Sequence, residues 1–69
     1  MHHYRGKILK KLDLIGLGCV EIMERKDGHF QFVHRVPCDS HTNEAVHFES
    51  PPYISIEATE AAARQKFKL

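Results

Sequence analysis

The segment from Gly18 to Val36 constrains the fold more than any other part of the chain. Two runs rich in β-branched and aromatic residues flank Lys26-Asp27-Gly28. A short Asp-Gly connection between such runs is one of the strongest local signals for a β-hairpin. The sequence therefore predicts a hairpin whose strands cover residues 19–26 and 29–36.

The length of the hairpin loop decides which side chains share a face. A three-residue loop with Gly28 in the left-handed region places Arg25 opposite His29. A two-residue Asp-Gly loop would slip the register by one residue and lose the apolar alternation. We therefore predict the three-residue loop, which collects apolar side chains on one face. These side chains are Val20, Ile22, Phe30 and Phe32.

The N-terminal part of the chain fits two kinds of element. As a helix over residues 4–17, it would gather its apolar residues on one side. As a strand over residues 4–12, it would place Ile8 and Leu12 on one face, although Lys10 disturbs that alternation. Because an isolated hairpin needs a third strand or a helix to be stable, we favour the strand.

The C-terminal half predicts a further strand and a helix. Alternation over residues 45–49 points Val46 and Phe48 to the same side. Ser55 can then cap a helix over residues 55–68, whose first turns are acidic and whose end is basic, as the helix dipole favours.

With 69 residues the chain has room for one domain, spanning residues 1–69. Together the elements predict an α+β fold: an antiparallel β-meander of three to four strands with one C-terminal α-helix packed on one face. The predicted core consists of Val20, Ile22, Phe30, Phe32, Val46 and Phe48.

Charge and cysteine content limit the classes of binding partner and the cellular location that we expect for this chain. Ten Lys and Arg balance nine Asp and Glu, so the chain lacks the strongly basic character of many nucleic-acid-binding proteins. Two cysteines are too few for the disulfide framework of a small secreted protein, which predicts reduced thiols and a cytoplasmic location. No apolar stretch is long enough for a membrane-spanning helix, so no membrane partner is expected.

Four residues are candidate ligands for a structural zinc ion. In the predicted register His34 lies opposite Val20 and next to Cys19, and Cys38 follows just beyond the strand. Two thiolates and two imidazoles suit tetrahedral zinc. The candidate set is Cys19, His34, Cys38 and His41. The favoured alternative is a chain without cofactor or metal, in which Cys19 is free and buried and Cys38 is free and exposed. The same proximity would also permit a Cys19–Cys38 disulfide.

Four polar side chains on or beside the other face of the hairpin are candidates for contacts with nucleic acid. Such a sheet with one C-terminal helix resembles the architecture of some integrase arm-binding domains. That resemblance implies readout of the DNA major groove by sheet residues. The residues in question are Arg25, His29, Gln31 and Arg35.

The chain contains no catalytic motif, so we predict a protein that is not an enzyme. Cys19, Met23 and Val33 would form an apolar strip on the outer sheet face, and an edge strand offers unpaired backbone groups. These features favour a binding module that acts through a protein partner or through homodimerisation. A nucleic-acid-binding domain is the second hypothesis and a small zinc-stabilised domain the third.

Overall fold

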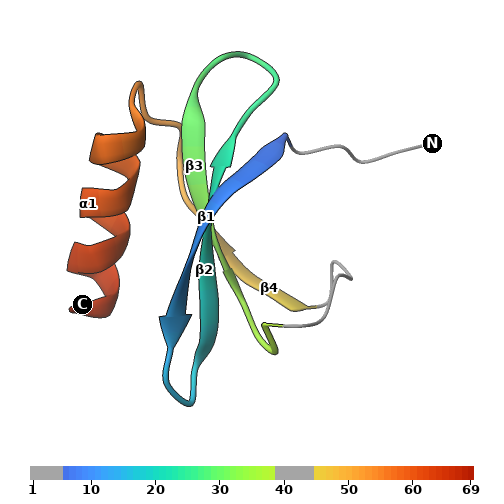
Figure 1. Ribbon diagram of the computed structural model, residues 1–69, viewed down its shortest axis with the longest axis vertical. Helices are drawn as coiled ribbons and strands as arrows, with labels where there is room; N and C mark the ends of the chain where they lie inside the picture. The colour runs from blue at the N-terminus through green and yellow to red at the C-terminus, as the bar shows by residue number, and fades with distance from the viewer. Residues whose placement is uncertain (1–5, 39–44) are drawn as a thin grey trace.

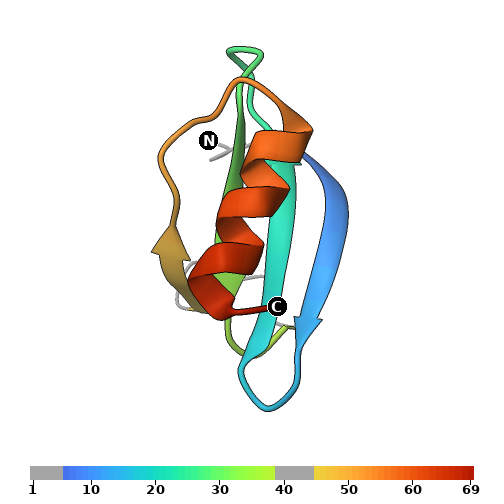
Figure 2. The same ribbon diagram turned by 90° about the vertical axis from the view of Figure 1, so that its left-hand side faces the viewer.

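The computed structural model describes residues 6–38 and 45–69, which form one antiparallel sheet and one helix (Figure 1). The elements are β1 (Lys7–Leu14), β2 (Gly18–Glu24), β3 (Phe30–Arg35), β4 (Val46–Glu49) and α1 (Ile56–Phe67). The strands lie in the order β1-β2-β3-β4. Figure 2 shows α1 in front of β2 and β3. The predicted meander with a C-terminal helix on one face is confirmed.

The central hairpin adopts the predicted register. The backbone N–H of Arg25 donates to His29 O over 2.7 Å, and that of Gly28 donates to Arg25 O over 3.2 Å. Gly28 has a φ of 87°, in the region that side chains with a Cβ disfavour. Ile22 lies opposite Phe32, as the three-residue loop requires. The turn therefore sets which face of the hairpin is apolar.

β1 is a strand, as favoured, but it contains an irregularity that the sequence pattern does not reveal. Its register against β2 shifts between Ile8 and Lys10, so that Ile8 lies opposite Met23 and Lys10 opposite Ile22. This β-bulge at Leu9 reverses the facing of the residues before it. The prediction that Ile8 shares the face of Leu12 is therefore wrong: Ile8 lies on the face away from the helix, and Lys10 on the helix face.

A second irregularity occurs in β4. Phe48 pairs with His34 and Val46 pairs with Arg35, so His47 is an extra residue in the strand. Val46 consequently lies on the Arg35 side of the sheet rather than in the predicted core. Phe48 does lie on the helix face, but it is 37% exposed there.

After β4 the chain continues alongside β3. The Ser50 N–H donates to Phe32 O over 2.9 Å, and the Ser50 hydroxyl accepts from the Phe32 N–H over 2.9 Å. Two reciprocal bonds between Tyr53 and Phe30 follow. Pro51 and Pro52 cannot donate to a ladder, so these bonds to Ser50 and Tyr53 satisfy the edge of β3 on either side of them.

The helix begins as predicted. The Ser55 hydroxyl accepts from the Ala58 N–H over 3.0 Å, and Lys68 ends the helix in a left-handed conformation. Thr59 and Ala63 are fully buried against the sheet. Their small side chains let the helix axis approach β2 and β3 closely.

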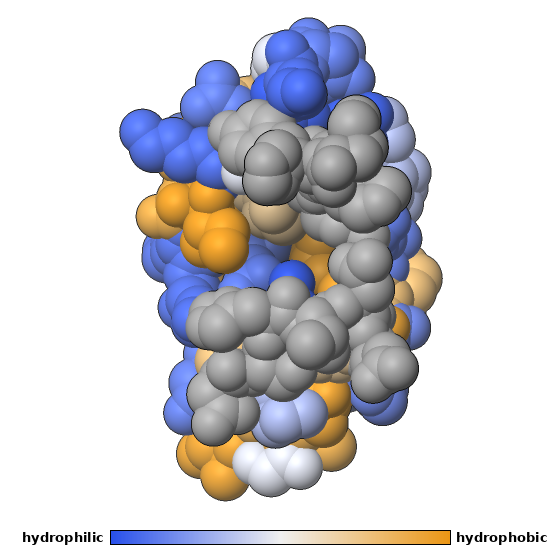
Figure 3. Space-filling model, turned by 90° about the vertical axis from the view of Figure 1, so that its right-hand side faces the viewer, coloured by the Kyte–Doolittle hydropathy of each residue, from blue (hydrophilic) through white to orange (hydrophobic). Residues whose placement is uncertain are grey.

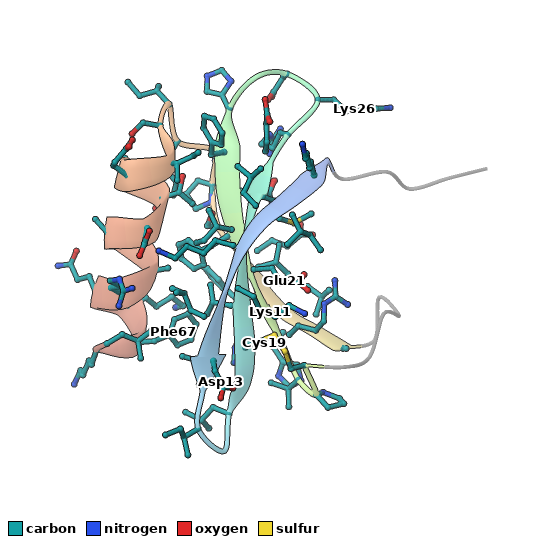
Figure 4. All side chains as sticks on the ribbon, in the orientation of Figure 1. Lys11, Asp13, Cys19, Glu21, Lys26 and Phe67 are labelled. Carbon is teal, nitrogen blue, oxygen red and sulfur yellow. A yellow bond between two sulfur atoms is a disulfide. The ribbon has the colours of Figure 1, made fainter. Side chains whose placement is uncertain are left out.

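The main core lies between α1 and the sheet. Its buried residues are Leu14, Val20, Ile22, Phe32 and Ala63, and Leu12, Tyr53, Ala62 and Phe67 pack around them. Figure 4 shows Phe67 pointing from the helix toward the sheet. Val20, Ile22 and Phe32 are core residues as predicted, whereas Phe30 is only half-buried. Within residues 6–38 and 45–69, no helix is long and apolar enough to cross a membrane.

Candidate functional site

The face of the sheet away from the helix is buried, although the sequence predicts a half-exposed surface. Its six central residues are each at most 9% exposed. The bulges in β1 and β4 place Ile8 and Val46 on this face, beside Met23 and Arg35 respectively. We call the six residues the outer-face cluster: Cys19, Glu21, Met23, Gln31, Val33 and Arg35.

An ion pair lies in the middle of the outer-face cluster. Arg35 Nε donates to Glu21 Oε1 over 3.2 Å, and Lys11 Nζ lies 3.9 Å from Glu21 Oε2. The Glu21 side chain is 1% exposed, whereas that of Lys11 is 46% exposed. Figure 4 shows Lys11 and Glu21 together on the side of the sheet away from the helix. A carboxylate this deeply buried needs its cationic neighbour.

The two cysteines are joined in a disulfide, so the expectation of reduced thiols is wrong for this structure. Cys19 is fully buried and its Cα lies 5.1 Å from that of Cys38. Beside Cys19, Gly18 lets the start of β2 lie close to the end of β3, because a Cβ at this position would collide with Arg35 O. The disulfide connects the start of β2 to the segment that follows β3.

The predicted zinc ligands are not brought together in the described part of the chain. The disulfide engages both thiols. His34 lies on the helix face, where its Nε2 is 2.7 Å from Leu17 O and its ring is 4.9 Å from that of Phe67. His41 lies outside the described residues. Among residues 6–38 and 45–69, no group of three or more His, Cys, Asp and Glu side chains is arranged to hold a metal ion.

Reduction of the disulfide should weaken the fold substantially. The Cys19–Cys38 bond links residues 19 positions apart. Closing a loop of this size restricts the unfolded chain, so reduction should lower the free energy of unfolding by about 3 kcal/mol. Urea denaturation with and without a reducing agent measures this change. Equal midpoints under the two conditions would show that the crosslink does not contribute to stability.

The predicted nucleic-acid contacts are mostly engaged within the protein. Arg25 Nη1 donates to Gln31 Oε1 over 2.8 Å, and Arg25 Nη2 lies 3.1 Å from Asp27 Oδ2. The hydrogen bond from Arg25 and that from the His29 N–H lower the pKa of Asp27 to about 2. Gln31 and Arg35 are buried in the outer-face cluster, and of the four residues His29 has the most exposed side chain.

The outer edge of β1 is exposed, in contrast to the outer face. β1 is an eight-residue edge strand whose inner side pairs with β2. Leu14 O accepts from the Leu17 N–H over 2.8 Å, so the backbone of Leu14 points toward β2. Successive residues of a strand direct their backbone groups to opposite sides. Asp13 and Lys11 therefore direct their N–H and C=O groups to the open side of β1.

The helix supports β1 from one face without covering its edge. Lys10 Nζ lies 2.9 Å from Glu60 Oε2, and Arg64 binds the same carboxylate over 2.8 Å. These two cations, that of Lys10 first, lower the pKa of Glu60 below its ordinary value. Lys10 is thus directed toward the helix, while Lys11 and Asp13 lie on the opposite face.

Apolar side chains are exposed near the edge and at its end. Ile8 is 48% exposed on β1, and Ile15 is 94% exposed in the turn between β1 and β2. In Figure 3, apolar surface lies at the lower end of the molecule, where this turn is located. Exposed apolar side chains beside unpaired backbone groups are typical of a surface that binds another chain.

The sequence predicts that an edge strand is exposed, but it does not predict which residues form that strand. The signal was present in Lys7, Lys10, Lys11 and Asp13, because charged residues, Lys above all, are common on edge strands. The chain matches no protein-family model, no curated protein and no solved structure.

Proposed function

We propose that the protein is a non-enzymatic binding module that captures an extended segment of another polypeptide along the open edge of β1. The observation that carries this proposal is the eight-residue edge strand, whose outward backbone groups at Lys11 and Asp13 have no strand beside them among the described residues. Addition of a strand to such an edge is a common mode of peptide recognition. Backbone hydrogen bonds would supply affinity, and the side chains would supply selectivity.

The charges on the outer face of β1 favour a partner strand with an opposite charge at the matching positions. Lys7 and Lys11 are exposed, and Lys11 lies opposite Glu21 within the sheet. A partner strand carrying Asp or Glu opposite Lys11 would place opposite charges across the new pair of strands. Cross-strand pairs of opposite charge stabilise a sheet, whereas like charges destabilise it.

The burial of the outer face supports a protein partner rather than a nucleic acid. Gln31 and Arg35, which would contact bases from the sheet, are buried, and Arg35 is paired with Glu21. The cytoplasmic location stays a prediction from the number of cysteines. The disulfide is instead typical of oxidising compartments, so its persistence in cells would place the chain there.

A display library of ten-residue peptides tests the proposal with a pair of matched variants. Lys11→Pro removes the outward N–H of Lys11, and Lys11→Ala removes the same charge but keeps that N–H. Peptides selected on the unmodified protein should bind the proline variant at least about tenfold more weakly than the alanine variant. We expect the selected peptides to alternate and to carry an acidic residue opposite Lys11 and a basic residue opposite Asp13.

The same peptide experiment can contradict the proposed use of the β1 edge. Selected peptides that bind the proline and alanine variants equally would show that they use another surface. Thermal melting of both variants is the control, because proline is tolerated on an edge strand where its N–H would face solvent.

A further inference from the structure

The residues of β1 form a pattern that is complementary to itself in one antiparallel register. Lys11 and Asp13 lie two positions apart, on the same face and with their backbone groups on the open side. Leu12, between them, lies on the helix face opposite Val20. Two copies of this strand placed antiparallel about Leu12 would set each Lys11 opposite the Asp13 of the other copy.

We infer that the partner of the β1 edge is a second copy of this chain, paired antiparallel with Leu12 on the two-fold axis. This inference rests on the proposed function, since it uses the same edge. The pairing joins the two sheets into one continuous sheet with both helices on the same face. Two Lys11–Asp13 pairs form across the dimer axis, because a two-fold interface repeats every contact.

Other antiparallel registers of two β1 strands are less favourable, because they set like charges or side chains of different faces opposite each other. A centre on Lys10 or Lys11 sets a lysine opposite its own copy, and a centre on Asp13 sets two carboxylates opposite each other. Like charges directly opposite destabilise a pair of strands. A centre between two residues would set side chains of the helix face opposite side chains of the other face, which the pleat does not permit.

The backbone geometry agrees with the register centred on Leu12. Lys11 and Asp13 both direct their N–H and C=O groups outward, so each Lys11–Asp13 pair exchanges two backbone hydrogen bonds. Leu12 then meets the second copy's Leu12 as a pair without hydrogen bonds, in which side chains lie closest. At either end of the paired segment, the exposed Leu9 approaches the second copy's exposed Ile15.

A charge exchange tests both the partner and the register. In Lys11→Asp each dimer contact would join two carboxylates, and in Asp13→Lys each would join two ammonium groups. Because each contact occurs twice, either variant alone should dimerise about tenfold more weakly than the unmodified chain. An equimolar mixture of the two variants restores both opposite-charge pairs and should form a heterodimer. Native mass spectrometry distinguishes the heterodimer from either homodimer by its mass.

A crosslink gives a second measurement that leaves the charges unchanged. Leu12→Cys places a thiol on the two-fold axis, where two Cβ atoms are close enough for a disulfide. Mild oxidation should therefore give a covalent dimer. Lys10→Cys lies on the same face two residues away from the axis, so it should give much less. The native Cys19–Cys38 pair is already oxidised and serves as an internal control.

The results separate this inference from the proposed function. An unmodified chain that stays monomeric over a wide range of concentrations would overturn self-pairing, while the peptide experiment would still judge the edge. A dimer that neither charge variant weakens would overturn the register. A heterodimer formed only in the mixture, together with selective crosslinking at position 12, would establish both the partner and the register.

Discussion

Replacing Arg35 with methionine should cost about 3–5 kcal/mol of folding free energy, because it leaves the buried carboxylate of Glu21 without its nearest cation. The Arg35 Nε–Glu21 Oε1 distance is 3.2 Å and Glu21 is 1% exposed. Lys11 cannot replace Arg35 as the partner of Glu21, since Lys11 Nζ lies 3.9 Å from Glu21 Oε2 and the Lys11 side chain is half exposed. Chemical denaturation of purified Arg35→Met should show a protein that is largely unfolded or close to unfolding.

Two further variants test whether the loss of folding free energy comes from the unpaired charge of Glu21. Lys11→Met removes the more exposed cation and should cost less than about 1 kcal/mol. The double variant Glu21→Leu with Arg35→Met removes both buried charges and should recover much of the stability, because apolar residues of similar volume can replace a buried ion pair. If Arg35→Met were as mild as Lys11→Met, the ion pair would not be a structural requirement of the outer face.

Replacing Phe32 with alanine should be comparably damaging, for an apolar reason. Phe32 is 2% exposed, and its ring lies 5.8 Å from that of Phe48, 6.5 Å from that of Tyr53 and 6.3 Å from that of Phe67. Loss of so buried an aromatic side chain costs about 3–5 kcal/mol in transfer and cavity terms. A domain of this size has little more stability than that, so the variant should be unfolded at physiological temperature.

Phe48→Ala is the matched control for Phe32→Ala. Phe48 contacts the same ring but is 37% exposed, and the ammonium of Lys66 lies 4.1 Å from the centroid of the Phe48 ring. Its loss should therefore cost clearly less, and differential scanning calorimetry would compare the two melting temperatures. Equal effects of the two substitutions would contradict the placement of the core under the helix.

The central hairpin could be predicted because its information is local. Lys26-Asp27-Gly28 specifies the loop, and the loop specifies that Ile22 faces Phe32. The Ser55 cap is local in the same sense, since its hydroxyl binds an N–H within the first turn of its own helix. Turn and cap chemistry depend on neighbours in the sequence, so one sequence is sufficient to predict them.

The facing of the edge strands could not be predicted in the same way. A bulge adds one residue to a strand and reverses the facing of everything before it. The break in alternation at Lys10 fits a helix as well as a bulged strand, and the residues around His47 show no break at all. The predicted core therefore included Val46, and Ile8 was predicted to share the face of Leu12. These two errors have one cause, because strict alternation assumes an uninterrupted ladder.

The candidate sites, like the strands, could be predicted only in part. The predicted register correctly placed His34 opposite Val20. His34 and Cys19 lie at the same end of the hairpin, but their side chains do not meet. They point to opposite faces, and the thiol of Cys19 bonds to Cys38 instead. Arg25 and Gln31 are hydrogen-bonded to each other, whereas Arg35 lies at the other end of the hairpin, opposite Cys19, and Asp27 and Glu21 engage the two arginines.

The sequence by itself determined the central β-hairpin, the strand after it and the capped helix, together with the apolar face formed by Val20, Ile22 and Phe32. It favoured a strand before the hairpin without excluding a helix. These features follow from turn chemistry and from periodicity, which act over a few residues. Only the tertiary structure decided that the outer face is buried, that Glu21 and Arg35 form an ion pair within it, and that β1 presents its edge to solvent. Those outcomes depend on how bulged strands and distant segments meet, and the free energy of such contacts is not encoded in any one stretch of the chain.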